Sequence, residues 1–255
     1  MPTITSDGVR IAYEVHGTGS GTGSGSGTGS SRLPLLLTHG FGESARMWEP
    51  NVAALSAARP VLTWDMRGHG DSESPPDQAR YTQPACLADM AAILDAAGAG
   101  RAVLGGLSLG GYLSLAFRLA DPGPVAALLL FDTGPGFRND EARQRWNEQA
   151  LATADRLERS GPAALGRARA ARGMLTQQDG TVIESLPSVD VPTLVLVGAD
   201  DTAFLGAASY LAAKIPTATL VTIPDAGHVA NRDQPAAFNE AVTAFLAGLG
   251  SDRLG

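Results

Sequence analysis

One serine in this sequence stands in a pattern that favours nucleophilic chemistry. Gly106, Leu107, Ser108, Leu109 and Gly110 form a G-x-S-x-G motif between an apolar strand-like run and an apolar helix-like run. In that context the motif predicts a sharp strand-to-helix turn that lifts the serine hydroxyl above a sheet. The glycines two residues before and after the serine let the strand and the helix pass without a Cβ clash. We therefore expect Ser108 to be a nucleophile.

A serine hydroxyl needs a general base, and four histidines could supply one. His228 lies just after the last strand-like run, and in a parallel sheet the loops that follow the strands share one edge. His39 in "THGFG" and His69 in "RGHGDS" also follow strands, but each lies inside a glycine-rich turn. His16 lies at the end of an early strand. His228 is therefore the predicted base.

The base in turn needs a carboxylate that fixes its tautomer and stabilises its protonated form. Asp200 and Asp201 follow the run "TLVLV", and Asp132 follows "ALLLF". Adjacent residues in an extended loop point in different directions, so only one of Asp200 and Asp201 is expected to reach His228. The residues alone leave these alternatives open.

The tetrahedral intermediate of acyl transfer carries a negatively charged oxygen that N–H groups must hold. The predicted donors are the backbone N–H of Leu109, at the start of a helix, and that of Phe41 in the loop "THGFGES". The candidate residues of the substrate pocket are His39, Phe41, Leu107, Leu109, Phe137 and Trp146. Phe137 and Trp146 have the alternative of packing only within their own helical segment.

Short apolar runs alternate with helix-like runs along most of the chain. The predicted strands are a hairpin over 2–15 with its turn at Asp7-Gly8, then 33–40, 60–65, 101–106, 125–132, 192–198 and 218–224. The predicted helices between them are 44–57, 83–98, 109–120, 205–215 and 235–249. This alternation predicts an α/β fold with a mostly parallel, doubly wound sheet of about eight strands.

Two intervals interrupt this alternation. Residues 133–189 contain no strand-like run and predict helices over 139–161 and 163–175. An excursion at the strand ends of an open sheet would lie over the ligand crevice, so we expect a small helical cap at 133–189, inserted into a core of 1–132 and 190–255. The Gly/Ser/Thr-rich segment 17–32 has nothing to bury, and we expect a flexible hairpin loop with its ends on neighbouring strands.

The composition argues against several classes of protein. The 19 Lys and Arg against 26 Asp and Glu give a formal net charge of -7, and without a basic stripe nucleic-acid binding has little support. Cys86 is the only cysteine, which rules out an intrachain disulfide. No apolar run approaches the roughly 18 residues of a membrane helix, and the histidines lack metal-binding spacing. We expect a soluble, cytoplasmic protein without metal, cofactor, nucleic-acid or membrane partner.

These motifs together resemble the α/β-hydrolase superfamily. The resemblance rests on "HGFGES", "DMRGHGDS", "GLSLGG", "VGADD" and "GHVANRDQP", in family order, and covers nearly the whole chain. It implies the branch of small cap-bearing serine esterases, C–C hydrolases and cofactor-free haloperoxidases. In relatives with VG-x-x-D the acid stands three residues after the glycine, which implies Asp201. It also implies that Phe41 gives an oxyanion amide and that His69 and Asp71 are structural.

A triad of Ser108, His228 and Asp201 without a cofactor predicts a serine hydrolase. The expected substrate is a small or medium carboxylic ester, cleaved through an acyl-enzyme. The same residues could serve C–C bond hydrolysis, lactone opening or peracid formation, and the sequence does not separate these reactions. A ligand receptor on the same fold is the alternative from another class. A dinucleotide site has little support, because "GGLSLGG" does not fit G-x-G-x-x-G.

Overall fold

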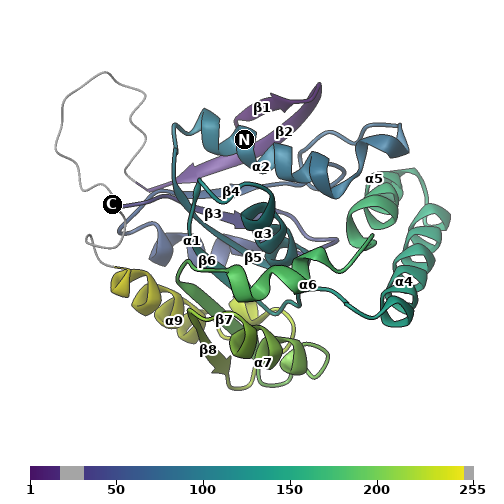
Figure 1. Ribbon diagram of the computed structural model, residues 1–255. Helices are drawn as coiled ribbons and strands as arrows, with labels where there is room; N and C mark the ends of the chain where they lie inside the picture. The colour runs from purple at the N-terminus through teal and green to yellow at the C-terminus, as the bar shows by residue number, and fades with distance from the viewer. Residues whose placement is uncertain (18–31, 250–255) are drawn as a thin grey trace.

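An eight-stranded sheet runs through the molecule in the order β1-β2-β4-β3-β5-β6-β7-β8 (Figure 1). The computed structural model describes residues 1–17 and 32–249. The strands are β1 (Thr3–Ser6), β2 (Val9–His16), β3 (Leu35–Thr38), β4 (Val61–Trp64), β5 (Ala102–Leu107), β6 (Val125–Phe131), β7 (Thr193–Gly198) and β8 (Ala218–Ile223). The pairs β1–β2 and β2–β4 are antiparallel, and the other pairs are parallel. The predicted α/β fold with a mostly parallel sheet is confirmed.

Helices cover both faces of this sheet. They are α1 (Glu49–Leu55), which follows the short helix η1 (Ala45–Trp48), α2 (Gln83–Ala96), α3 (Leu109–Ala120), α7 (Leu205–Lys214), α8 (Ala230–Asp233) and α9 (Pro235–Gly248), with the short helix η2 (Gln78–Arg80) before α2. Within the part of the chain that the structure describes, no helix has the length and apolarity that crossing a membrane requires.

Two apolar layers hold the helices on the sheet. Successive strand residues point to opposite faces. Leu36 belongs to the same buried layer as residues of α2, α3 and α7, whereas Leu35 and Leu37 belong to the layer that includes residues of α1 and α9. All three leucines are fully buried, and burying each contributes roughly 1.5–3 kcal/mol. The central strands are therefore apolar on both faces and read as continuous runs in the sequence.

The hairpin of β1 and β2 turns at Asp7 and Gly8, whose φ angles are 47° and 72°. Two successive residues with positive φ suit the turn that an Asp-Gly pair favours. The expectation that segment 17–32 joins neighbouring strands is wrong. His16 pairs with Val61 of β4, and Leu35 pairs with the same residue from the other side, so β4 lies between β2 and β3. The predicted flexible loop itself falls on residues 18–31, outside the described residues.

The chain between β6 and β7 is helical, and its first helix is the outermost element in Figure 1. Its elements are α4 (Asp140–Arg159), η3 (Pro162–Ala164), α5 (Leu165–Ala170), the π-helical turn η4 (Ala171–Leu175), α6 (Thr181–Ser185) and η5 (Leu186–Ser188). Asn147 of α4 exchanges two 2.8 Å hydrogen bonds with the backbone of Gln177. Arg172 forms ion pairs with Asp155 and Glu158. The division of the chain into a core and an inserted cap stays a prediction.

Candidate active site

Ser108 occupies the sharp turn between β5 and α3. Its φ of 54° and ψ of −116° lie outside the regions that non-glycine residues favour. A Cβ on Gly106 would lie 2.3 Å from the carbonyl carbon of Gly110, and one on Gly110 would lie 2.2 Å from the carbonyl oxygen of Thr38. Only glycine fits at either position. The structure therefore has the strand-to-helix turn that the G-x-S-x-G motif predicts.

Hydrogen bonds from β6 and the loop after it hold this turn. The Ser108 N–H donates to the carbonyl of Phe131 at 2.9 Å. The Thr133 hydroxyl donates to the carbonyl of Ser108 at 2.6 Å. Sequence reasoning missed Thr133, because nothing in the sequence indicates which residue after β6 reaches the serine backbone.

His228 and Asp201 meet at the carboxyl ends of β8 and β7. The Nδ1 of His228 lies 2.8 Å from Oδ2 of Asp201. Asp201 is only 5% exposed, whereas the side chain of His228 is 41% exposed. An ionised carboxylate only accepts hydrogen bonds, so Nδ1 carries the proton and Nε2 is free to accept one. Asp200 is exposed, and its side chain makes no such contact. Of the two adjacent aspartates, the structure brings Asp201 to the histidine.

The side chain of Phe204 lies near both Ser108 and His228. Phe204 lines the same cavity as Ser108, and its ring stacks on that of His228 with centroids 4.8 Å apart. Among residues 1–17 and 32–249, no hydrogen bond joins the Ser108 hydroxyl to His228. Catalytic hydrogen bonds of this kind are often long before substrate binds and shorten in the complex.

Asp132, the third candidate acid, bonds to the backbone of Gly198 instead of to His228. It is fully buried after β6, with a φ of 43°. Its Oδ1 accepts the N–H of Gly198 at 2.8 Å, and its Oδ2 has no partner among the described residues. Burial, and secondarily the charge of Asp201, raise the pKa of Asp132 to about 8. Gly198 lies three residues before Asp201, so Asp132 supports the loop that carries the acid.

The loop after β3, which contains Phe41, passes close to the turn at Ser108. A Cβ on Gly40 would lie 3.7 Å from the Cβ of Ser108, so this loop passes directly beside the serine. Leu109, the second predicted donor, is the first residue of α3, and its N–H lies at the positive end of the helix. Both backbone amides thus come from segments adjacent to Ser108.

Two buried histidines support this loop from behind. The ring of His39 bonds to the carbonyl of Gly40 at 2.7 Å and to the N–H of Met66 at 3.0 Å. The Nε2 of His69 accepts the N–H of Gly42 at 3.2 Å. Burial lowers the pKa of His39, and burial lowers that of His69 to about 3. Both rings are therefore neutral and can accept a backbone N–H. The structural role expected of His69 agrees with this geometry.

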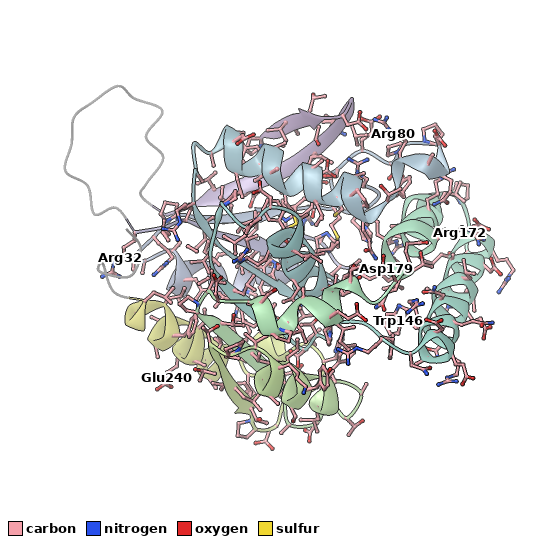
Figure 2. All side chains as sticks on the ribbon, in the orientation of Figure 1. Arg32, Arg80, Trp146, Arg172, Asp179 and Glu240 are labelled. Carbon is pink, nitrogen blue, oxygen red and sulfur yellow. The ribbon has the colours of Figure 1, made fainter. Side chains whose placement is uncertain are left out.

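An apolar cavity of about 210 Å³ opens beside Ser108. Phe137 and Trp146 line it, with ring centroids 5.9 Å apart. The indole N–H of Trp146 donates to the carbonyl of Leu175 at 2.8 Å, which fixes the ring on the side of α4 that faces the sheet (Figure 2). None of the described residues that line the cavity carries a charge. Nor do the described residues bring three or more His, Cys, Asp or Glu together as a metal site would need.

Two of the predicted pocket residues are placed elsewhere. His39 is fully buried behind the loop after β3, and Leu107 is 1% exposed, in the apolar layer under the turn. Phe41 packs edge-on against His69. The assignment of His39 and Leu107 to the pocket is therefore corrected, whereas that of Phe41 stays a prediction. Sequence reasoning missed Tyr112, which lines the cavity. Its position four residues after Ser108, on the same face of α3, is a signal that could have found it.

The sequence and the fold of this chain are similar to those of known hydrolases. Residues 35–241 match the family model described as the "Alpha/beta hydrolase family". A thermophilic esterase from Thermogutta terrifontis is 30% identical, with a TM-score of 0.83 over 97% of this chain and 98% of its own. The enol-lactonase from Burkholderia xenovorans LB400 is 26% identical, with a TM-score of 0.78 over 96% and 100%. A hydrolase from Pseudomonas aeruginosa PA01 is 29% identical, with a TM-score of 0.77 over 96% and 97%.

Proposed function

This chain belongs to the alpha/beta hydrolase family, and from that membership we propose that it cleaves small, neutral carboxylic esters with Ser108 as nucleophile. One observation carries the proposal above the others. The Asp201–His228 hydrogen bond of 2.8 Å lies at the same sheet edge as the strained Ser108, whose hydroxyl borders an uncharged cavity. The likeness to the Thermogutta terrifontis esterase, at 30% identity, supports it as well.

In the first half of the reaction, the Ser108 oxygen attacks the carbonyl carbon of the ester. Its proton passes to the free Nε2 of His228, while Asp201 stabilises the imidazolium that forms. The backbone N–H groups of Phe41 and Leu109 hold the negative oxygen of the intermediate, and each such donor typically lowers the barrier by about 3–4 kcal/mol. Collapse of the intermediate breaks the ester C–O bond. His228 returns its proton to the departing alcohol, and the acyl group stays on Ser108.

Water completes the cycle by the reverse sequence of proton transfers. His228 takes a proton from the attacking water, and the same two N–H groups hold the second oxyanion. The bond between the acyl carbon and the Ser108 oxygen then breaks, and His228 reprotonates the serine. The product leaves as a carboxylic acid.

The cavity supports a neutral, apolar substrate. A charged group in an uncharged, largely apolar cavity would lose its hydration without gaining a partner, which costs several kcal/mol. Because no charged side chain is among the described residues that line the cavity, a substrate carboxylate next to the reacting carbonyl would bind poorly. A lactone is a cyclic ester with the same carbonyl chemistry, and the likeness to an enol-lactonase makes it the second candidate substrate.

The proposal is tested by hydrolysis of p-nitrophenyl acetate, butyrate and octanoate and of a neutral lactone. Ser108→Ala should lower kcat by up to about 10⁶, because triad members act as a unit. Ser209→Ala is a matched control, since Ser209 is exposed on α7 and, among the residues that the structure describes, its hydroxyl bonds only to the carbonyl of Leu205 in its own helix. Mass spectrometry should also find a fluorophosphonate adduct on Ser108. Turnover that is equal in wild type and Ser108→Ala would refute the proposal.

A further inference from the structure

A second hollow lies behind the cavity at Ser108, and one side chain borders both. We call the 210 Å³ space at Ser108 the inner cavity. The outer groove is the open space of about 640 Å³ between α2, α3 and α6, bordered by Leu87, Ala116, Leu119, Gly173 and Val182. Tyr112 borders the inner cavity and the outer groove alike. Its ring is therefore part of the partition between them.

Contacts with neighbouring residues hold the side chain of Tyr112 in place. Tyr112 is 8% exposed on α3, and its hydroxyl lies 3.5 Å from the amide oxygen of Gln83. The amide nitrogen of Gln83 donates to the carbonyls of Met174 and Thr176, at 3.1 and 2.8 Å. These contacts tie α2, α3 and the segment after α5 together at the partition. Burial raises the pKa of Tyr112 to about 12, so the hydroxyl stays neutral.

Apolar side chains line part of both spaces, although Gln78, Gln178 and Thr181 also border the outer groove. Leu109 and Met174 line the inner cavity beside Tyr112, and Ala116 and Leu119 continue along the same helix α3 into the outer groove. The charged residue of the groove is Asp179, which Figure 2 labels near Trp146 of α4. An apolar chain that passed the plane of the Tyr112 ring would meet an apolar path along α3.

We propose that Tyr112 sets the upper length of the apolar arm of the ester that this enzyme accepts, because its ring closes the inner cavity against the outer groove. The inference rests on the proposed function and adds a specificity-determining residue to it. In the wild type, a chain that fills the inner cavity gains apolar burial up to the ring. Each further methylene must then displace the ring or stay in water.

The test is a chain-length profile in two series. One series is p-nitrophenyl esters from acetate to decanoate, and the other is acetates of linear alcohols from ethanol to decanol. Each methylene accommodated in an apolar pocket changes kcat/KM by on the order of tenfold. In Tyr112→Ala the decline of kcat/KM should move to longer chains in at least one series. The ratio of long-chain to short-chain kcat/KM should rise at least about tenfold.

Matched variants separate the loss of the Tyr112 ring from the other effects of Tyr112→Ala. Tyr112→Phe removes only the hydroxyl and should keep the wild-type length limit, since the ring forms the wall. Leu119→Ala changes only the outer groove, where Leu119 is 43% exposed, and should leave the wild-type profile as it is. In Tyr112→Ala, a second change of Leu119→Trp should fill the groove and return the ratio toward the wild-type value. Tyr112→Leu keeps apolar packing on α3 and replaces Tyr112→Ala in the chain-length test if that variant does not fold.

An unchanged length ratio in both series, in a Tyr112→Ala or Tyr112→Leu enzyme that still turns over the shortest ester, would overturn the inference. Failure of the proposed function looks different, because no ester would then show Ser108-dependent turnover in any variant. In that case, the binding of linear alcohols measured by calorimetry tests whether the Tyr112 ring closes the inner cavity. Decanol should bind Tyr112→Ala at least about tenfold more tightly than wild type, and equal affinities would overturn the inference.

Discussion

The carboxylate of Asp201 accepts a 2.8 Å hydrogen bond from His228, whereas its neighbour Asp200 is exposed. We expect Asp201→Asn to lower kcat for a p-nitrophenyl ester by about 10⁴, because the amide would favour the wrong histidine tautomer. Asp200→Asn is the matched control and should change kcat less than about twofold. A damaging Asp200→Asn beside a mild Asp201→Asn would contradict the assignment of the acid.

His69 offers a test of the loop that carries Phe41. His69→Phe keeps a ring in the buried site but leaves the N–H of Gly42 without its acceptor. The Phe41 amide would then be less well held, and kcat should fall by up to about 10², below the loss for removing a donor outright. His16→Phe is the control, since the His16 ring bonds to Thr63 and, among the described residues, makes no hydrogen bond to the backbone of the loop over 39–43. Equal kcat in wild type and His69→Phe would show that the loop needs no such support.

At this scale the sequence predicted the residues that carry local signals. Ser108 stands in a motif whose glycines have one steric purpose, and His228 follows a strand that must end at the same edge. The residues alone left Asp132, Asp200 and Asp201 open as the acid, and only the family resemblance favoured Asp201. The partners of buried polar groups could not be predicted, because they depend on which loops meet in space. His39 was therefore assigned to the pocket although its ring is buried, and Tyr112 was not assigned at all.

Helix α4 is joined to the segment before α6 by the side-chain amide of Asn147, which makes two 2.8 Å hydrogen bonds to the Gln177 backbone. Asn147→Leu should lower the free energy of unfolding by about 1–3 kcal/mol and raise KM, because Gln177 lines the inner cavity. Gln144→Leu is the control, since Gln144 bonds only to Glu148 on the same helix. Urea unfolding and ester kinetics check both variants. A larger loss in Gln144→Leu would contradict this account.

The strands were predicted well because most are apolar on both faces and so stand out as short continuous runs. Helix α4 was predicted from its long polar run, and its start at Asn139, whose side chain caps Ala142, agrees. The short helices α6 and η5 were not predicted. Their sequence "TVIESLPS" is too short for a helical period to emerge, and its buried residues Val182 and Leu186 are fixed by packing on the core.

For the molecule as a whole, we expect the free energy of unfolding to pass through a maximum as the pH is raised from acid to alkaline values. His39 and His69 are neutral in the folded state, and in the unfolded chain they take up protons below about pH 6.5. The lowered pKa of His69, about 3, therefore removes stability as the pH falls from about 6.5 toward 3, and the lowered pKa of His39 acts in the same direction below about pH 6.5. Asp132 has the opposite effect, because its raised pKa removes stability as the pH rises from about 4 to about 8.

Asp132→Asn tests the alkaline side of this window. The variant removes a carboxyl that is ionised in the unfolded chain and protonated in the fold. Its stability relative to wild type should therefore rise between pH 5 and 8, by up to about 1.4 kcal/mol per pH unit. Urea unfolding at each pH measures the difference, with the exposed Asp121→Asn as control. A difference that is constant over this range would show that Asp132 is ionised in the fold.

The order of the strands is the feature that sequence reasoning could least supply. Alternating strands and helices fix a parallel sheet, but nothing in "RIAYEVH" indicates that β2 joins the edge of β4 rather than that of β3. The choice is made by pairing across the whole sheet, with Tyr13 opposite Trp64 and His16 opposite Val61.

The residues proposed to act in catalysis come from distant parts of the described chain. Ser108 and the two proposed oxyanion amides lie before α4, whereas Asp201 and His228 follow β7 and β8, the last strands in the described part of the chain. During translation the first half can fold its turn and its loop while the base is still unmade. A nascent or prematurely ended chain would therefore hold a serine without its activating partner. The proposed hydrolysis becomes possible only after the ribosome has added β7, β8 and the residues that follow them.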